Sequence, residues 1–471
     1  MGSLHKRLEE YAGSDYYPYH MPGHKRRLFG EALAPVAAWD ITEIEGFDNL
    51  HDAKGILHRL QLRAAEVYGA EESFFLVNGS TSGILSAVSA ALPKRGKLLM
   101  VRGSHKSVYH AAYLRSLEIT YLLPGIHPKF GCMLAATAAQ VEQALAEDAD
   151  IGAVLIVSPT YEGLTAETAE IAKIVHRRGI PLIVDEAHGA HLGFHEGWPL
   201  NASRLGADLV IQSLHKTLPS LTQTAILHVN GGLIDRRKLK RFLEIYQSSS
   251  PSYIFMAGME EAIEIAAQGA ERLFGDFEKN WKEMLEILGG CKALRFLQEK
   301  NMDKGKLAIM DTTGSLSGKQ LYDKLLNQYH LQLEMAAGRY ALAMFTIGDT
   351  TEGYERLTKA LLVIDGALER RSWSLAGGEL HGRQGQWTCP EQKYPLYEAW
   401  DKETERVPLE KAAGKVAGGF IVPYPPDIPI VVPGEVITEE ICCYLQECVK
   451  DGLTVQGMEE QNCQLYVEII K

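Results

Sequence analysis

The sequence predicts an α/β protein built on a doubly wound, mainly parallel sheet of seven strands. Between about residues 55 and 230, short apolar runs alternate with helix-length segments, which is the pattern of a parallel sheet covered by helices on both faces. Polar residues follow several of these runs, and sheets of this kind bind ligands outside the carboxyl ends of their strands. The predicted strands are Ser73–Val77, Leu98–Val101, Ile119–Leu123, Ala153–Val157, Pro181–Val184, Leu209–Ile211 and Thr224–Val229.

The segments around these strands read as helices. Apolar residues at helical spacing predict a helix over Leu57–Tyr68, before the first strand, and another over Ile84–Leu92, after it. A long helical pattern over Ala257–Leu288 leads away from the sheet region. Beyond it, Leu307–Thr312 and Tyr340–Thr346 are expected to be strands of a smaller α/β domain.

Changes in composition suggest four regions. We expect an N-terminal segment over residues 1–50, a large domain over 51–260, a small α/β domain over 261–370 and a C-terminal domain over 371–471. The last region contains Val422–Pro429, where four prolines stand within eight residues. Proline fixes φ and donates no backbone hydrogen bond, so this stretch predicts an extended, turn-rich path.

Composition excludes several classes of partner. The chain has 471 residues, of which 46% are hydrophobic and 23% charged, and a formal net charge of −12. Nucleic acid or an anionic membrane is therefore not expected as a main partner, since both require clustered cations. The seven cysteines are odd in number with no CxxC pair, and no apolar run approaches the ~20 residues of a membrane span. These features favour a reducing, cytoplasmic location.

One lysine stands at the end of an apolar strand. Lys216 follows that strand within Ser213-Leu214-His215-Lys216, and Asp185 follows the strand before it along the chain. This pattern is typical of pyridoxal phosphate enzymes, in which lysine forms the Schiff base and aspartate keeps the pyridine nitrogen protonated. Ser213 and His215 are placed to bind the cofactor's phosphate from the same loop. The plainer alternatives are a surface lysine and a helix-capping aspartate.

A second polar segment follows the first predicted strand. Ser80, Thr81 and Ser82 lie in Asn78–Gly83, which opens the next helix. Hydroxyls and backbone N–H groups at a positive helix N-terminus bind phosphate. An ordinary N-capped helix after a tight turn is the alternative.

Several histidines also occur near strand ends. His105 follows the second predicted strand, and its ring could stack on an aromatic cofactor, bind a carboxylate or transfer a proton. A solvated loop histidine is the alternative. His188, His191 and His195 are spaced closely enough to suggest zinc, but no glutamate accompanies them in an HExxH arrangement. We therefore expect no metal site, with His188 alone facing the crevice.

With these residues in view, the chain closely resembles the Orn/Lys/Arg decarboxylase family, the bacterial basic amino acid decarboxylases of aspartate-aminotransferase fold (pyridoxal phosphate fold type I). The resemblance covers nearly the whole chain, with the motifs in the family's order. They are His20–Lys25, Asp40–Glu43 with Asp48–His51, Val184–Gly189, Ser213–Leu218 and Val422–Pro426.

The resemblance implies a role for each candidate residue. By this resemblance, Lys216 would form the Schiff base, Asp185 would bind the pyridine nitrogen and His105 would stack on the ring. His188 would lie near the phenolic oxygen of the cofactor. The phosphate would be surrounded by Thr81, Ser82, Ser213 and His215. The segment Ser248–Pro251 resembles the one that reaches the partner subunit's phosphate. The resemblance thus implies a homodimer with its active site at the subunit interface.

The implied reaction is pyridoxal phosphate-dependent decarboxylation of a basic amino acid. Arginine, which would give agmatine and CO2 in polyamine metabolism, is favoured over lysine and ornithine, and Lys216 or His105 would reprotonate Cα. The alternatives are an aminotransferase or lyase of the same fold and a non-catalytic pyridoxal phosphate- or metal-binding protein. Because the motifs begin by residue 20, the resemblance is to the short, biosynthetic form without an N-terminal receiver-like domain.

Four acidic residues raise the questions of what binds the basic side chain of the substrate and what role Asp427 has. Glu45, Asp48 and Glu162 are candidates for binding the basic side chain of the substrate, or else ordinary surface and loop residues. Asp427 stands where the family usually has glycine. Its distance from Lys216 in sequence predicts a structural role.

Overall fold

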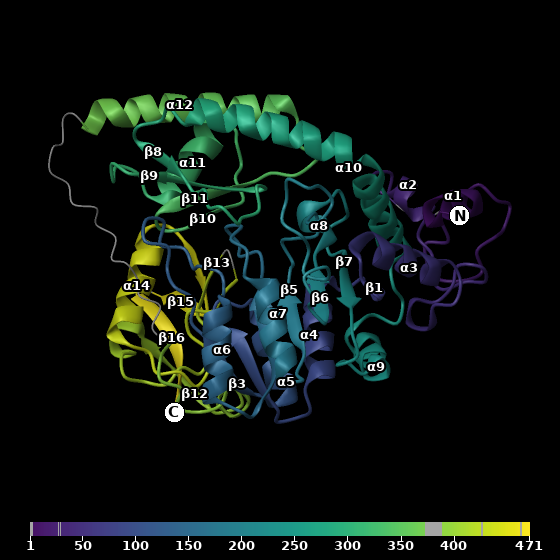
Figure 1. Cartoon of the computed structure of the whole chain (residues 1–471), viewed down its shortest axis with the longest axis horizontal. Coiled ribbons are helices and arrows are strands. Elements are labelled where there is room, and N and C mark those ends of the chain that lie inside the picture. The colour runs from purple at the N-terminus through teal and green to yellow at the C-terminus, as the bar shows by residue number, and fades with distance from the viewer. Residues whose placement is uncertain (1–2, 27, 29, 373–388, 425–426, 462–463) are drawn as a thin grey trace. The chain divides into compact units, whose positions relative to one another are not determined.

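A computed structural model describes residues 3–26, 28, 30–372, 389–424, 427–461 and 464–471 (Figure 1). The chain divides into two compact units. The first comprises Met1–Pro93, Gly152–Ser158 and Thr168–Phe274, and the second Lys94–Ile151, Pro159–Glu167 and Gly275–Lys471. The region boundaries expected near residues 50, 260 and 370 stay predictions.

The described helices and strands are as follows. The helices are α1 Leu4–Ala12, α2 Ala34–Ala37, α3 Ile56–Tyr68, α4 Gly79–Ala91, α5 Lys106–Arg115, α6 Ala138–Glu147, α7 Thr168–Arg177, α8 Leu214–Thr217, α9 Arg236–Tyr246, α10 Tyr253–Leu288, α11 Gly318–Tyr329, α12 Thr351–Ser372, α13 Leu396–Ala399 and α14 Glu439–Lys450. The strands are β1 Glu72–Leu76, β2 Lys97–Val101, β3 Glu118–Leu122, β4 Ile151–Val157, β5 Leu182–Asp185, β6 Leu209–Gln212, β7 Ala225–Val229, β8 Leu294–Phe296, β9 Lys306–Asp311, β10 Met335–Ala336, β11 Tyr340–Met344, β12 Thr404–Pro408, β13 Val422–Tyr424, β14 Thr454–Gln456, β15 Met458–Gln461 and β16 Gln464–Ile470.

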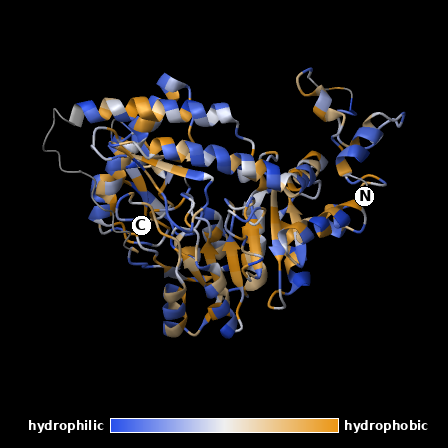
Figure 2. Cartoon of the chain, turned by 45° about the horizontal axis from the view of Figure 1, so that its top comes forward, coloured by the Kyte–Doolittle hydropathy of each residue, from blue (hydrophilic) through white to orange (hydrophobic). Residues whose placement is uncertain are grey.

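The large sheet has seven strands in the order β1-β7-β6-β5-β4-β2-β3. The pairs β2–β3, β4–β5 and β5–β6 are parallel, whereas β7 runs antiparallel to both β1 and β6. Every residue of β5, β6 and β7 is buried, and Figure 2 shows the strands of this sheet mostly in the hydrophobic colour. Strands covered on both faces read as continuous apolar runs, which is why the sequence revealed them. The predicted fold is thus confirmed.

Helix α4 begins earlier than predicted, at Gly79 instead of Ile84. It packs closely on the sheet at Gly83, where a Cβ would lie 2.6 Å from Cδ1 of Leu76 and 3.0 Å from Cγ2 of Ile211. Serine and threonine are weak helix formers, so the sequence predicted that the helix would begin only at the first strongly apolar residue, Ile84. Tertiary packing overrides that preference.

The second unit contains smaller sheets. A four-stranded sheet has the order β10-β11-β9-β8, and its strands pair antiparallel. The strands expected over Leu307–Thr312 and Tyr340–Thr346 are its β9 and β11. Farther along the chain, a three-stranded sheet β12-β16-β15 and the pair β13-β14 accompany α14, with apolar side chains from these elements forming a common core. Across the described helices, none is long and apolar enough to cross a bilayer.

Candidate active site

Lys216 lies in the short helix α8, directly after the buried strand β6. Its Nζ is 3.1 Å from Nε2 of His188, which belongs to the turn after β5. Lys216 is half-buried, and His188 is buried. The fold therefore brings together two residues that the sequence singled out on different strands.

Asp185 is the last residue of β5 and pairs in register with Ile211 of β6. It is 5% exposed, and its Oδ1 accepts a hydrogen bond of 3.2 Å from the N–H of Ala187. Because β5 and β6 are parallel neighbours, their carboxyl ends meet at one edge of the sheet. Asp185 and the loop that carries Lys216 leave the sheet at that edge.

The two predicted phosphate-binding segments touch each other. The Oγ of Ser213, the residue before α8, donates to Oγ of Ser80 in the first turn of α4 at 2.9 Å. The Oγ of Ser82 donates back to the carbonyl of Gly79 at 2.8 Å, while Thr81 is exposed. Hydroxyls from Ser213, which follows β6, and from α4 therefore gather at the positive end of a 13-residue helix.

His215 lies in the same loop as Lys216. Its Nδ1 is 2.8 Å from the carbonyl oxygen of Thr224, and since a carbonyl only accepts, Nδ1 carries a proton. Burial lowers the pKa of His215, and the charge of Lys216 lowers it further. The imidazole is therefore favoured in its neutral form in the ligand-free protein.

A buried polar group beside Asp185 escaped the sequence analysis. Glu186 is 2% exposed; its Oε2 accepts from Nε2 of Gln212 at 2.7 Å and its Oε1 from the N–H of Ala202 at 2.9 Å. Burial raises the pKa of Glu186 to about 8, and the charge of Asp185 adds to the shift. At neutral pH this carboxyl group is mostly protonated.

The same polar network continues across the sheet. Oε1 of Gln212 is 3.1 Å from Nε2 of His228, whose Nδ1 is 2.7 Å from Oγ of Ser73. Burial lowers the pKa of His228 to about 3, so the ring is neutral. The sequence signal for this network is one polar residue in each of two apolar runs, Gln212 at the end of β6 and His228 within β7.

His191 and His195, whose spacing with His188 had suggested zinc, pack against aromatic rings. His191 meets Trp198 edge-on, with centroids 4.9 Å apart, and His195 stacks on Phe274 at 6.2 Å. Within the part of the chain that the structure describes, no three His, Cys, Asp or Glu residues are grouped so as to hold a metal ion. His188 contacts Lys216 instead.

His105 belongs to the second unit, where it caps the N-terminus of α5. Its Nδ1 accepts from the N–H of Ser107 at 3.1 Å, and its Nε2 is 3.3 Å from Oδ2 of Asp427. The same Oδ2 is 2.9 Å from Nζ of Lys106. The carboxylate of Asp427 thus contacts a predicted site residue, although Asp427 is distant from Lys216 in sequence; its expected structural role stays a prediction. Of the proline-rich motif, Pro425 and Pro426 lie outside the described residues.

The three candidate acidic residues have different surroundings. Asp48 accepts backbone N–H groups from the turn before α3, including those of Lys54 and Gly55; burial alone would raise the pKa of Asp48, but these bonds lower it. Glu162, in the second unit, is buried and accepts from the hydroxyl of Tyr340 at 2.5 Å. Burial raises the pKa of Glu162. Glu45 is exposed.

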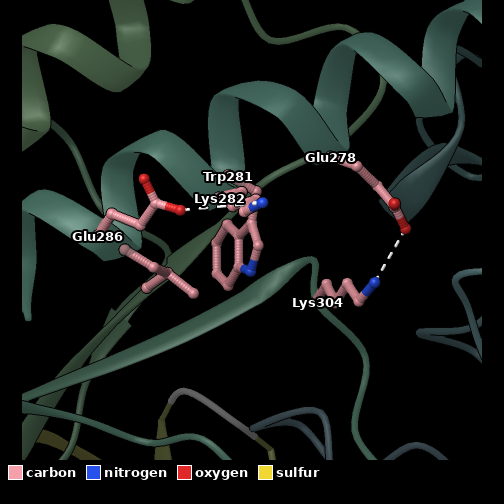
Figure 3. A pocket seen from close by; sticks show the side chains of 6 residues that line it. Glu278, Trp281, Lys282, Glu286 and Lys304 are labelled. Atoms are coloured by element: carbon pink, nitrogen blue, oxygen red, sulfur yellow. Dashed lines mark hydrogen bonds and ion pairs between the residues drawn. The ribbon is translucent and has the colours of Figure 1, made fainter.

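A surface hollow occurs elsewhere, in the second unit (Figure 3). Trp281 of α10 faces it, and ion pairs join Lys304 to Glu278 at 2.8 Å and Lys282 to Glu286 at 3.9 Å. None of the predicted site residues lines this hollow.

Comparison with known proteins identifies the family. The model of the Orn/Lys/Arg decarboxylase major domain matches residues 3–332, and that of the family's C-terminal domain matches residues 389–467. An arginine decarboxylase of Bacillus subtilis is 31% identical, with 99% of this chain and 97% of the relative covered. The inducible lysine decarboxylase of Escherichia coli is 23% identical, and the match covers 97% of this chain and 78% of that relative.

Solved structures agree on the fold. The lysine decarboxylase LdcF of Francisella novicida superposes with a TM-score of 0.83 at 18% identity, covering 99% of this chain and 81% of that one. Lysine decarboxylase A from Pseudomonas aeruginosa superposes with a TM-score of 0.82 at 20% identity, and the match covers 100% of this chain and 80% of that one. The chain therefore belongs to the Orn/Lys/Arg decarboxylase family, as its motifs predict.

Proposed function

We propose that this decarboxylase uses pyridoxal phosphate, attached to Lys216, to release CO2 from arginine and form agmatine, a precursor in polyamine metabolism. The observation that carries the proposal is the 3.1 Å contact between Lys216 and His188, at the sheet edge where Asp185 ends the neighbouring strand. An amine, a buried carboxylate and an imidazole there match what the cofactor requires.

The residues around Lys216 suit a phosphorylated cofactor. The hydroxyls of Ser80 and Ser213, already in contact, and the N–H groups of the first turn of α4 would bind the phosphate. The Nδ1 of His215 is engaged by Thr224, so Nε2 is the nitrogen that would donate to the phosphate. A nearby phosphate dianion would raise the pKa of this ring and favour the required proton.

Each remaining residue has a chemical task. When bound, the pyridoxal ring supplies an electron sink for the pair left as the Cα–carboxylate bond breaks. Asp185 would hold the proton on the pyridine nitrogen, because a buried carboxylate stabilises a nearby cation. Lys216 or His105 would return a proton to Cα.

Arginine is preferred as the substrate because of the curated relatives. The arginine decarboxylase of Bacillus subtilis is 31% identical and matched over 97% of its length, whereas the constitutive lysine decarboxylase of Escherichia coli is 24% identical and matched over 70%. Lysine and ornithine remain alternatives.

Side-by-side turnover of the three amino acids tests the proposal. Purified protein with pyridoxal phosphate should release CO2 from arginine faster than from lysine or ornithine, with agmatine as the product. Release of a keto acid without CO2 would instead favour an aminotransferase of the same fold.

We also propose a homodimer with the active site at the subunit interface. Several large apolar side chains of the N-terminal segment are exposed, namely Tyr16, Tyr17, Tyr19, Met21, Leu28, Leu33 and Val36, and exposed apolar surface is a feature of contact surfaces. Ser248 is exposed, and its N–H donates to Oδ1 of Asn78, just before α4, at 3.0 Å. Sedimentation equilibrium should give the mass of two chains; a single-chain mass with full activity would refute the proposal.

A reducing, cytoplasmic location is part of the same proposal. The cysteines within the described residues are free thiols: Cys132, Cys291, Cys389, Cys442, Cys443 and Cys448. Thiols persist where the compartment is reducing. Fractionation of the native host should recover the enzyme with cytoplasmic markers.

A further inference from the structure

Asp427 is bound to the residues at the start of α5 by three contacts. Its carbonyl accepts from the N–H of Lys106 at 3.3 Å, and its Oδ2 lies 2.9 Å from Nζ of Lys106 and 3.3 Å from Nε2 of His105. The backbone of Asp427 has φ +60°, a left-handed conformation that aspartate tolerates better than most residues. The side chain is thereby held against His105.

The contacts of His105 define which ring nitrogen carries the proton. The N–H of Ser107 donates to Nδ1 at 3.1 Å, and a backbone amide can only donate. In the neutral ring Nδ1 is therefore the acceptor, and the proton is on Nε2. Nε2 lies 3.3 Å from Oδ2 of Asp427, and a carboxylate beside a ring nitrogen favours the tautomer that carries its proton on that nitrogen.

Both ring nitrogens of His105 are therefore in contact with a polar group, Nδ1 with Ser107 and Nε2 with Asp427. Contacts at both nitrogens restrain the orientation of the imidazole ring.

The segment that carries Asp427 is itself firmly anchored. Arg102, 2% exposed, donates to the carbonyls of Pro429 and Ile430 and to Oε2 of Glu435, each at 2.9 Å. Arg102 directly follows β2, in the loop that leads to His105. The C-terminal region is thus fixed to this loop at two points, by Arg102 and by Asp427.

We propose that Asp427 is a positioning residue for His105, holding the Nε2–H tautomer and the ring orientation in which His105 stacks on the cofactor. The inference rests on the proposed function, since stacking presupposes pyridoxal phosphate. It goes beyond that function by assigning a role to a side chain from the C-terminal region.

The test uses the holoenzyme with Asp427→Ala and Asp427→Asn. Asp427→Ala should lower kcat for arginine by about tenfold or more, the size of effect usual when a carboxylate that orients a histidine is removed. KM should change little, and the visible circular dichroism band of the bound cofactor should shift. Asp427→Asn keeps an oxygen that accepts from Nε2–H, so it should recover most of the lost activity.

Two control variants separate this role from general attachment to α5. The hydroxyl of Tyr113 of α5 donates to Oδ1 of Asp401 at 2.6 Å, so Asp401→Ala removes a different hydrogen-bond acceptor from α5, one that does not contact His105; this variant should match the wild type. Lys106→Met removes the ion pair but keeps the His105 contact, and should keep the wild-type dichroism band. The same band shift in Lys106→Met as in Asp427→Ala would overturn the proposal, as would wild-type kcat in Asp427→Ala.

A cofactor-independent measurement distinguishes failure of this inference from failure of the proposed function. The 15N shifts of His105, assigned with His105→Gln, should report the Nε2–H tautomer in the wild type and a mixture in Asp427→Ala. If the wild type shows no imine band and no CO2 release, the proposed function fails. If the tautomer is unchanged in Asp427→Ala, the positioning role of Asp427 fails whatever the activity.

Discussion

The Oγ of Ser213 donates a 2.9 Å hydrogen bond to Oγ of Ser80, joining the end of β6 to the first turn of α4. These two segments lie far apart in sequence, yet their hydroxyls meet where a phosphate would bind. The same loop carries Lys216, whose Nζ is 3.1 Å from His188. The residues proposed to bind the phosphate and to attach the cofactor therefore lie at one edge of the sheet.

Ser213→Ala should weaken cofactor binding. A hydrogen bond to a charged group contributes about 1.5–3 kcal/mol, so the dissociation constant for pyridoxal phosphate should rise roughly tenfold or more. Titration of apoenzyme followed by cofactor fluorescence measures this constant. Ser86→Ala is the matched control, because Ser86 is a buried serine of α4 whose Oγ has no hydrogen-bond partner among the described residues. Unchanged binding in Ser213→Ala would contradict the phosphate site.

Lys216→Ala should abolish the imine absorption band and lower decarboxylation by at least ~10³-fold, the usual cost of losing a covalent catalyst. The measurement is a visible spectrum of cofactor-saturated protein together with CO2 release. Lys54→Ala, at an exposed lysine paired with Asp52, should behave like the wild type. A persistent imine band in Lys216→Ala would place the attachment elsewhere.

Glu186→Gln should flatten the pH dependence of stability. Burial raises the pKa of Glu186 from its ordinary value of 4.5 to about 8 in the folded protein. Between these two pH values the folded state binds more protons than the unfolded state, so stability falls as pH rises. His228, with its pKa lowered from 6.5 to about 3, acts in the opposite direction but only below pH 6.5. Between pH 6.5 and 8 the wild type should therefore lose roughly 2 kcal/mol relative to Glu186→Gln.

Urea unfolding at several pH values measures this difference. The slope with pH is the readout, not the absolute stability, because a glutamine amide cannot accept from both Gln212 and Ala202 as the carboxyl oxygens do. Parallel slopes in the two proteins would show that Glu186 ionises normally.

Gly83→Ala should destabilise the protein by about 1–3 kcal/mol, because the added Cβ would overlap Leu76 and Ile211 at the contact of α4 with the sheet. Gly366→Ala is the control: Gly366 is inside α12, and apart from its chain neighbours and the backbone of its own helix, no atom of the residues that the structure covers lies within 4 Å of an added Cβ. There alanine should stabilise the helix by up to about 1 kcal/mol. Thermal unfolding of both variants checks the contrast, and equal melting temperatures would argue against close packing at Gly83.

The sequence by itself determined the sheet and the two residues at its edge. Buried parallel strands are continuous apolar runs, and their ends are visible wherever a polar residue interrupts them. Lys216 and Asp185 stand at such ends, so their placement at one edge followed from the topology that the runs imply. Motifs spread along the chain then identified the family.

Only the tertiary structure decided the contacts between residues distant in sequence. Nothing in local periodicity pairs Gln212 with Glu186 or Asp427 with His105, because a hydrogen bond between remote segments depends on how their elements pack. The start of α4 is a related case: local propensity delays the helix to Ile84, whereas packing of Gly83 on the sheet extends it back to Gly79. Periodicity records which face of an element is buried, and packing alone decides which polar partner that face meets.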